Sequence, residues 1–312
     1  MKTVRFYETG GPEVLRYEDA ERPDPGEGEV RIVVAGSAFS PADAAIRAGF
    51  LPLPIALPHT PGYDVSGTID AIGQGVHDLT VGERVIGFLP MAADGSASQY
   101  VIAPADVLVT APTAIPLADS AGVPSVALTA WQALYEAGEL QSGQRVLING
   151  AGGAVGGYAV QLAKRAGAYV IATASPQSRQ VVSAAGADEI IDHTTSTVPD
   201  AVGEPVDLLL NLALVSPDEF TALVTRVRDG GKVVSTTAAL PTPGDEQRDV
   251  SATTLFVRPD TGLLSRIVAL IDSGELHVEI ARHAPLSDLP SIHQQAAAGQ
   301  VHGKIVIVPP AA

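Results

Sequence analysis

The feature that most constrains the fold of this sequence is a run of strand, glycine turn, helix and strand between residues 145 and 172. Residues 145–149 are a short apolar run that is typical of a buried parallel strand. Five of the eight residues 150–157 are glycine, and apolar residues then recur at helical spacing over 158–166. A second apolar run at 169–172 completes the pattern, which predicts a βαβ crossover of about 30 residues.

The glycine turn predicts a nucleotide site. A pyrophosphate binds well at a helix N-terminus, where backbone N–H groups lack partners and the helix dipole favours negative charge. Glycine is needed there because a Cβ would block the phosphate or hold the helix away from the strand. The spacing Ala151-x-Gly153-x-x-Gly156 departs from the usual G-x-G-x-x-G by the alanine in its first position. A tight βα turn without a ligand is the alternative interpretation.

The residues after the second strand favour NADPH over NADH. An NAD site carries Asp or Glu about 20 residues beyond the turn, where the carboxylate accepts a hydrogen bond from the ribose 2′-hydroxyl. Residues 174–179 contain no acid, whereas Ser175 and Arg179 can contact a 2′-phosphate, the arginine through charge-assisted hydrogen bonds. The alternative is that Arg179 only opens the next helix as a solvated residue.

Charge and composition disfavour several classes of protein. Lys and Arg number 19 against 35 Asp and Glu, and the net charge of −16 disfavours binding to nucleic acids or anionic membranes. The absence of cysteine excludes disulfides, thiol nucleophiles and Cys-ligated zinc. No signal-peptide region and no run of about 18 apolar residues is found, so we expect a soluble, cytoplasmic protein.

Local patterns divide the chain into three segments. Residues 1–115 contain short strand candidates separated by glycine and proline turns, which is typical of a small barrel or a folded antiparallel sheet. Strands and helices alternate over 116–255, including a helix predicted at 217–228, and this alternation predicts a doubly wound, mostly parallel sheet. Residues 256–312 end in an apolar strand at 303–308, which we expect to complete a sheet of the first segment.

Short motifs along nearly the whole chain give it a family resemblance. The motifs are Gly10-Gly-Pro-Glu-Val-Leu15, Pro23-x-Pro-Gly-x-Gly-Glu-Val30, Pro41-x-Asp43 with Arg47-x-Gly49, Pro61-Gly-Tyr-Asp-x-Ser-Gly67, Leu128-Thr-Ala-x-Gln-Ala-Leu134, Gly153-x-x-Gly156 with Ala159-Val-Gln-Leu-Ala-Lys164, Gly186-Ala-Asp188 and Gly303-Lys-Ile-Val306. Together they resemble the zinc-independent NADPH:quinone oxidoreductases of the medium-chain dehydrogenase/reductase superfamily. The resemblance implies an α/β fold in which a GroES-like, mostly-β substrate and catalytic domain (1–115 and 256–312) joins a doubly wound Rossmann domain (116–255) that binds NADPH.

Zinc-dependent alcohol dehydrogenases of the same superfamily are similar too, but their zinc ligands are not matched. Ser40 stands where they carry a cysteine, and Tyr63-Asp64 stand where they carry His-Glu. None of the seven histidines, which include His59, shows the paired helical spacing of metal ligands, and each is interpreted as a surface or packing residue. We therefore expect no catalytic zinc.

The resemblance implies hydride transfer from the nicotinamide to a quinone or a related activated carbonyl or alkene. The protein then supplies proximity and donors to the developing oxyanion. We expect Ser40, Asp43 and Tyr63 to line the catalytic site, with the Tyr63 hydroxyl as the donor. The alternative for Tyr63 is a hydrogen-bonded residue at a strand start. Ser40 replaces the asparagine that is usual before Pro41, which leaves its contact with substrate open.

The remaining positions that match the family bind the cofactor. Thr129 matches a contact on the nicotinamide side, and His193 falls where relatives place a tyrosine against the adenosine. The matched residues of the pyrophosphate loop are Ala151, Gly153, Ala154 and Val155, those of the 2′-phosphate pocket are Ser175 and Arg179, and those over the ribose and nicotinamide are Asn211, Thr236, Phe256 and Val257. Phe256 can equally be a core residue.

Two other functions stay open, and both keep the NADPH site. The protein can be a reductase of enone or alkenal double bonds, or a non-catalytic NADPH-binding sensor, the latter suggested by Ser40. Acceptor specificity is expected to depend on the proline-containing loops at 50–59 and 240–247. A homodimer is implied by the resemblance.

Overall fold

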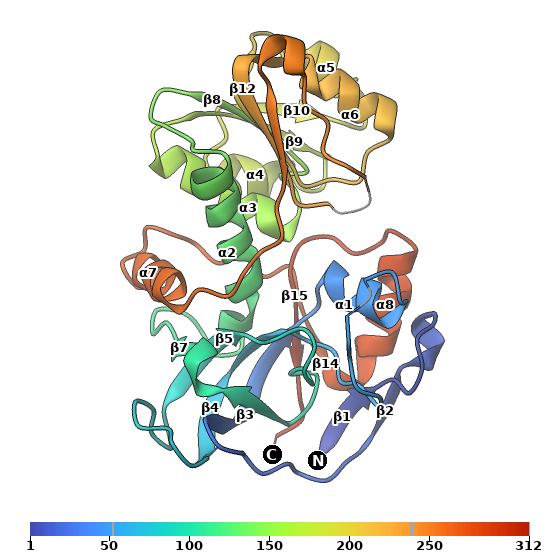
Figure 1. The fold of residues 1–312 in the computed structure, drawn as a ribbon, viewed down its shortest axis with the longest axis vertical. Helices are drawn as coiled ribbons and strands as arrows, with labels where there is room; N and C mark the ends of the chain where they lie inside the picture. Colours follow the sequence, from blue (N-terminus) through green and yellow to red (C-terminus); the bar gives the residue numbers. More distant parts are fainter. Residues whose placement is uncertain (52, 238–239, 312) are drawn as a thin grey trace. The chain divides into compact units, whose positions relative to one another are not determined.

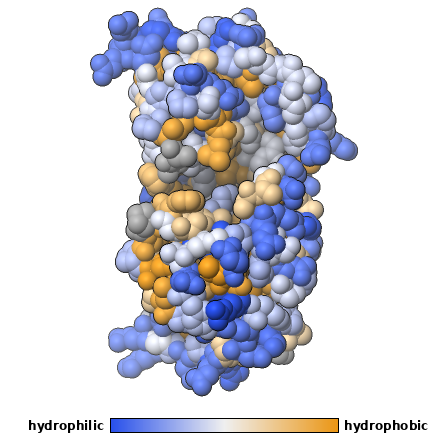
Figure 2. Space-filling view, turned by 90° about the vertical axis from the view of Figure 1, so that its right-hand side faces the viewer, coloured by the Kyte–Doolittle hydropathy of each residue, from blue (hydrophilic) through white to orange (hydrophobic). Residues whose placement is uncertain are grey.

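The computed structural model describes residues 1–51, 53–237 and 240–311, so Pro52 of the first predicted specificity loop lies outside the described residues. The chain forms two compact units: a terminal unit of residues 1–125 and 259–312, and a central unit of residues 126–258. The elements of both are labelled in Figure 1. No helix among the described residues is long and apolar enough to cross a membrane. Hydrophilic residues cover much of the face shown in Figure 2, with hydrophobic residues in patches among them.

The unit boundaries lie after Ser125 and Arg258, whereas the sequence analysis placed them after residues 115 and 255. The first difference arises because residues 116–125 pack on the sheet of the terminal unit. Ser125 donates both its N–H and its hydroxyl to Asp64 at 2.7 Å. The second arises because the buried Gln132 amide exchanges two hydrogen bonds with the backbone of Arg258, at 2.9 and 3.1 Å.

The terminal unit is built on a seven-stranded sheet of order β14-β15-β3-β4-β5-β7, in which β6 also pairs with β3. All its pairs are antiparallel except β14 with β15. Its strands are β3 (Glu29–Ala38), β4 (Asp64–Ile72), β5 (Arg84–Phe88), β6 (Tyr100–Pro104), β7 (Leu108–Thr110), β14 (Arg282–Pro285) and β15 (Ile305–Val308), and β1 (Lys2–Arg5) pairs separately with β2 (Arg16–Asp19). Its helices are α1 (Pro41–Arg47), α7 (Thr261–Asp272) and α8 (Leu289–Ala297). The last strand, β15, pairs with β3, so both ends of the sequence contribute to one unit.

The central unit is a six-stranded sheet in which every pair is parallel, of order β10-β9-β8-β11-β12-β13. Its strands are β8 (Arg145–Asn149), β9 (Tyr169–Ala174), β10 (Glu189–Asp192), β11 (Val206–Asn211), β12 (Val227–Ser235) and β13 (Ser251–Thr254), and its helices are α2 (Pro124–Trp131, which begins in the terminal unit), α3 (Ala154–Arg165), α4 (Arg179–Ala184), α5 (Val198–Ala201) and α6 (Pro217–Val224). Figure 1 shows α3 and α4 on one side of this sheet and α5 and α6 on the other. The predicted fold class, a doubly wound parallel sheet with a second, mostly-β unit, is confirmed.

The strand order reverses between β8 and β11 in the central sheet. Counted from β8, the order is 3-2-1-4-5-6, the arrangement of dinucleotide-binding sheets. Ligands of such sheets bind beyond the carboxyl ends of the strands at this reversal. The glycine turn follows β8, so the topology places the predicted nucleotide site at the reversal.

The helix predicted at 217–228 is wrong at its end. Helix α6 stops at Val224, and β12 already begins at Val227 and continues through Gly230 and Gly231. Val227 is fully buried and pairs with Val206, and the register between β11 and β12 shifts just beyond this pair. Gly230 adopts a φ of 70°, which absorbs the irregularity within the strand, so the two glycines do not mark a helix end.

Candidate functional site

The glycine turn after β8 has the geometry that a phosphate site requires. Gly150 turns the chain with a φ of 91°, and Gly156 lies so close to the turn that a Cβ would stand 2.3 Å from the Ala151 carbonyl oxygen. The N-cap of α3 is Gly153, and no side chain of the described residues caps this helix. The first N–H groups of α3, such as those of Ala154 and Val155, therefore have no capping side chain among the described residues. Ala151 is buried, and Gly150 performs the tight turn one residue before it.

A chain of buried polar side chains runs across the carboxyl ends of the central strands. The Thr173 hydroxyl accepts the Gly150 N–H at 2.8 Å and donates to the Asn149 side chain at 3.1 Å. Asn149 donates to Asn211 at 2.9 Å, and Asn211 donates onward to the Ala213 carbonyl oxygen at 3.0 Å. The predicted site residue Asn211 therefore connects the loop after β11 to the glycine turn after β8.

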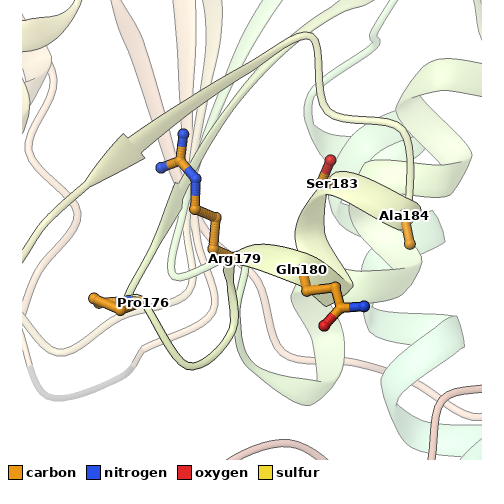
Figure 3. A pocket seen from close by; sticks show the side chains of 5 residues that line it. All are labelled: Pro176, Arg179, Gln180, Ser183 and Ala184. Atoms are coloured by element: carbon orange, nitrogen blue, oxygen red, sulfur yellow. The ribbon is translucent and has the colours of Figure 1, made fainter.

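The turn between β9 and α4 lies against the glycine turn. A Cβ at Gly152 would stand 2.4 Å from the Ser178 hydroxyl, and Ser178 in turn accepts the Ser175 N–H at 3.1 Å. Arg179 begins α4 and is exposed. The pKa of Asp192 at the end of β10 is lowered by hydrogen bonds from Thr194 and, to a smaller extent, by the charges of His193 and Arg179. Figure 3 shows the Arg179 guanidinium extending away from Gln180 in the shallow pocket that both residues line. An exposed guanidinium beside a serine turn is suited to a phosphate group.

The other predicted cofactor residues lie in the same unit. The Thr236 N–H donates to the Asn211 carbonyl oxygen at 3.1 Å, and the His193 N–H donates to the Ala174 carbonyl oxygen at 3.3 Å. Thr129 lies on α2 and is 8% exposed. Phe256 is 67% exposed, which rules out the alternative that it is a core residue, and Val257 follows it in the same segment beyond β13.

Ser40 and Asp43 close the N-terminus of α1 in the terminal unit. Ser40 is the N-cap, and its hydroxyl accepts the Ala42 N–H at 3.3 Å. The buried Asp43 carboxylate accepts the Ser40 N–H at 2.8 Å and the Gly62 N–H at 3.0 Å. Both predicted catalytic side chains thus hold the backbone, and Asp43 fixes the turn that immediately precedes Tyr63.

Tyr63 is buried just before β4, and its hydroxyl contacts the ring of His59. The hydroxyl lies 3.1 Å from His59 Nε2. Burial, together with the charges of Asp43 and Asp94, raises the pKa of Tyr63, which keeps the phenol protonated. Burial lowers the pKa of His59, and Asp94 opposes this shift only in part. The site therefore combines a neutral phenol with a neutral imidazole at ordinary pH.

Asp64, which stands at a position where zinc enzymes carry a ligand, is engaged within the protein. Its Oδ2 accepts from the Lys304 ammonium at 2.8 Å and from the Ser125 hydroxyl at 2.7 Å, and both members of the ion pair are almost fully buried. Among the described residues, no three His, Cys, Asp or Glu side chains are placed to hold a metal ion together.

Comparison with known proteins identifies the class and then the family. Residues 26–113 match the alcohol dehydrogenase GroES-like domain, and residues 185–307 match the zinc-binding dehydrogenase domain. These domains and the two-unit fold are those of the medium-chain dehydrogenase/reductase superfamily.

The most informative relatives are quinone and enone reductases. The chain is 30% identical to a chloroplastic quinone oxidoreductase of Triphysaria versicolor, over 99% of this chain and 98% of that protein. It is 31% identical to the chloroplastic NADPH-dependent alkenal/one oxidoreductase of Arabidopsis thaliana, over 99% of this chain and 80% of that protein. The solved structure of Escherichia coli quinone oxidoreductase complexed with NADPH superposes with a TM-score of 0.89 at 25% identity, covering 99% of this chain and 100% of that one.

The protein belongs to the quinone oxidoreductase family of this superfamily, and the predicted resemblance is confirmed. It is accordingly an oxidoreductase that uses a nicotinamide cofactor.

Sequence reasoning missed several residues that the structure places at these sites. Asn149 and Thr173 stand at or near the carboxyl ends of parallel strands, and that position could have revealed them, because such ends meet at one edge of a sheet. His59 was interpreted as a surface or packing residue. No local signal could have paired it with Tyr63 and Asp94, because residues 59–63 have no regular spacing and Asp94 lies far along the chain.

Proposed function

We propose that this protein is an NADPH-dependent reductase that transfers hydride to quinones or related activated carbonyl and alkene acceptors without zinc. The observation that carries the proposal is the uncapped N-terminus of α3 at the strand reversal, with the exposed Arg179 at the start of α4. Gly150 makes the tight turn and Gly156 lets α3 approach it closely, while a Cβ added at Gly153 would have only the Gly150 carbonyl oxygen within 4 Å. This arrangement supports a pyrophosphate at the N-terminus of α3. When bound, the nicotinamide supplies the hydride.

The central unit binds the cofactor in this proposal. The N–H groups around Gly153, Ala154 and Val155 hold the pyrophosphate, and Ser175 with Arg179 holds the 2′-phosphate. The remaining predicted contacts, with the adenosine, ribose and nicotinamide, are Thr129, Ala151, His193, Asn211, Thr236, Phe256 and Val257. Support for NADPH over NADH comes from Arg179, since the turn after β9 offers no carboxylate to a 2′-hydroxyl.

The terminal unit handles the acceptor. Tyr63 donates its hydroxyl proton to the oxyanion that hydride addition creates, while Asp43 and Ser40 hold the backbone turns that position it. Zinc is not required because a phenol donor takes the place of the Lewis acid, and because the matched ligand positions are Ser40, Tyr63 and the ion-paired Asp64. The expected homodimer stays a prediction.

The acceptor class and the cofactor can be tested together by following absorbance at the reduced-nicotinamide band. Purified protein is offered NADPH or NADH with a panel of quinones and enones. Loss of NADPH with quinones supports the proposal, and loss with enones alone would make the protein a double-bond reductase like its Arabidopsis relative. Saturable NADPH binding without turnover of any acceptor would contradict an enzymatic role and favour a sensor.

The cofactor preference rests on Arg179, so Arg179→Ala is the informative variant. Loss of a charge-assisted contact to the 2′-phosphate is expected to raise the KM for NADPH at least about tenfold while the KM for NADH stays nearly constant. Arg228→Ala is the matched control, since Arg228 is exposed in the same unit and already pairs with Asp207. Equal effects of Arg179→Ala on both cofactors would contradict the 2′-phosphate assignment.

A further inference from the structure

Three side chains form a line from the buried Tyr63 phenol to the protein surface. His59 Nε2 lies 3.1 Å from the Tyr63 hydroxyl, and His59 Nδ1 lies 3.8 Å from a carboxylate oxygen of Asp94. Tyr63 and His59 are 3% and 1% exposed, whereas the Asp94 side chain is 57% exposed. Asp94 is therefore the exposed end of this line, and Tyr63 and His59 are buried.

The backbone and the neighbouring side chains hold this line in place. His59 exchanges two backbone hydrogen bonds with Phe6, at 2.9 and 3.0 Å, and its ring packs edge-on against the Phe6 ring with centroids 5.3 Å apart. The same Asp94 oxygen that faces His59 accepts the Thr60 N–H at 2.7 Å. An imidazole placed in this way has one nitrogen toward the phenol and the other toward the surface.

We propose that His59 and Asp94 form a proton path that restores the Tyr63 proton from solvent after each reduction. This inference rests on the proposed function, in which Tyr63 protonates the reduced acceptor. His59 and Asp94 act through Tyr63 and are positioning and relay residues, since neither is proposed to touch the acceptor.

The step balances in protons and electrons. Hydride addition reduces a quinone by two electrons and leaves the hydroquinone monoanion. The Tyr63 O–H bond breaks as its proton forms the second hydroxyl of the hydroquinone, and the resulting phenolate takes the proton from His59 Nε2. The Nδ1 atom of His59 takes a proton from water beside Asp94 as Nε2 releases its own, so no imidazolate forms, and NADPH, quinone and one solvent proton give NADP⁺ and hydroquinone. The Nδ1–H tautomer left by this step returns to the Nε2–H tautomer before the next turnover, when the ring turns and exchanges its proton with that water. A water is needed at this end because 3.8 Å exceeds hydrogen-bond length.

The charges around the line are suited to this task. The charge of Asp94 acts on both His59 and Tyr63. The charge of Asp43 also acts on Tyr63, and Asp43 is in turn influenced by the charges of Lys304 and Asp64. A neutral imidazole can accept a proton on one nitrogen and donate from the other, which a permanently charged group cannot do. The carboxylate near Nδ1 favours arrival of a proton there.

The test compares His59→Gln with Tyr63→Phe in stopped-flow mixing of NADPH and excess 1,4-naphthoquinone. If His59 only restores the proton, His59→Gln oxidises about one equivalent of NADPH per site at a nearly normal rate and then slows at least about tenfold, in a phase with a solvent deuterium isotope effect. Tyr63→Phe loses the first turnover as well. Asp94→Asn is expected to slow the second phase by a smaller factor, and His77→Gln, which alters an exposed histidine, serves as the control.

Imidazole rescue and cofactor binding separate the relay from a structural role. Added imidazole is expected to accelerate the slow phase of His59→Ala, while the Kd for NADPH stays at the wild-type value in every variant. A uniform slowing of both phases in His59→Gln, without rescue, would overturn the relay while leaving the reductase intact. Absence of NADPH oxidation by the wild-type protein with every acceptor would overturn the proposed function and the relay with it.

Discussion

The N-termini of α1 and α3 present the same backbone feature and use it in opposite ways. At α1, Ser40 and Asp43 satisfy N–H groups of the chain with side chains of the chain itself. At α3, Gly153 is the N-cap and no described side chain takes that role. Capping stabilises a fold by about 1 kcal/mol, so an uncapped helix end at a strand reversal is a stability cost that ligand binding can offset. The comparison teaches that missing caps, as well as present side chains, mark a site for an anion.

The largest effect is expected on NADPH binding, from a substitution that displaces the uncapped N-terminus of α3. Gly156→Val would place side-chain atoms against the Ala151 backbone, which already lies 2.3 Å from an ideal Cβ. The N-terminus of α3 must then move away from β8, and we expect NADPH to bind at least about 100-fold more weakly in a fluorescence titration.

Gly157→Ala is the control for this variant, because no heavy atom lies within 4 Å of the added Cβ. It should leave the Kd for NADPH unchanged. A folded Gly156→Val protein, checked by circular dichroism, that binds NADPH as the wild type does would contradict binding at the end of α3.

The second-largest effect is expected on stability, from removing the Asp43 carboxylate at the N-terminus of α1. Asp43→Ala removes the acceptor of two backbone N–H groups that are held in the terminal unit, and we expect a loss of about 2 kcal/mol in the free energy of unfolding, measured with urea. Asp272→Ala is a matched control, since this exposed carboxylate also accepts two backbone N–H groups but leaves them near water when it is removed. Equal losses in the two variants would show that burial of Asp43 adds nothing.

The contribution of Asp43 to stability is also expected to depend on pH. Burial raises the pKa of Asp43 to about 7, against the opposing influence of its two backbone donors and of Lys304. The unfolded chain releases this proton near pH 4, so between about pH 4 and 7 the folded state binds more protons than the unfolded state. The contribution of Asp43 is therefore complete below about pH 4 and is lost as the pH rises through 7.

Asp43→Asn removes this titration and provides the measurement. We expect the deficit in stability of Asp43→Asn relative to wild type to shrink by about 2.5 kcal/mol between pH 5 and pH 8, because the wild-type folded state loses its extra proton over this interval. Burial lowers the pKa of His293 to about 3, which makes stability fall with acid, but this contribution is present in both proteins and cancels. A deficit that does not change with pH would mean that the carboxylate stays ionised between its two donors.

The smallest effect on the free energy of unfolding is expected from removing the Ser40 hydroxyl that caps α1. Ser40→Ala removes one hydrogen bond to the Ala42 N–H and should cost about 1 kcal/mol or less in the free energy of unfolding. Ser216→Ala, which removes the single cap of α6, should cost a similar amount. A much larger loss at Ser40 would point to a role beyond capping.

Much of the central unit was predictable because its information is local. Strand β8 spans the predicted residues 145–149 and β9 begins at the predicted residue 169, since short apolar runs bounded by turns are typical of buried strands. The end of α6 was mispredicted because burial of Val227 in the sheet outweighed the glycines that follow it. Predicted Ser175 and Arg179 lie in one turn because they are four residues apart, whereas their neighbour Ser178 was missed.

The sequence by itself determined the family, the parallel sheet and the glycine turn, because these depend on spacing and on residues that lack a Cβ. Tertiary structure alone decided which polar side chains meet. It engages Asp43 with the backbone of Gly62, pairs Asp64 with Lys304 across most of the chain length, and aligns His59 between Tyr63 and Asp94. Such contacts join irregular segments that are distant in sequence, and burial then sets their protonation, so neither spacing nor composition can specify them.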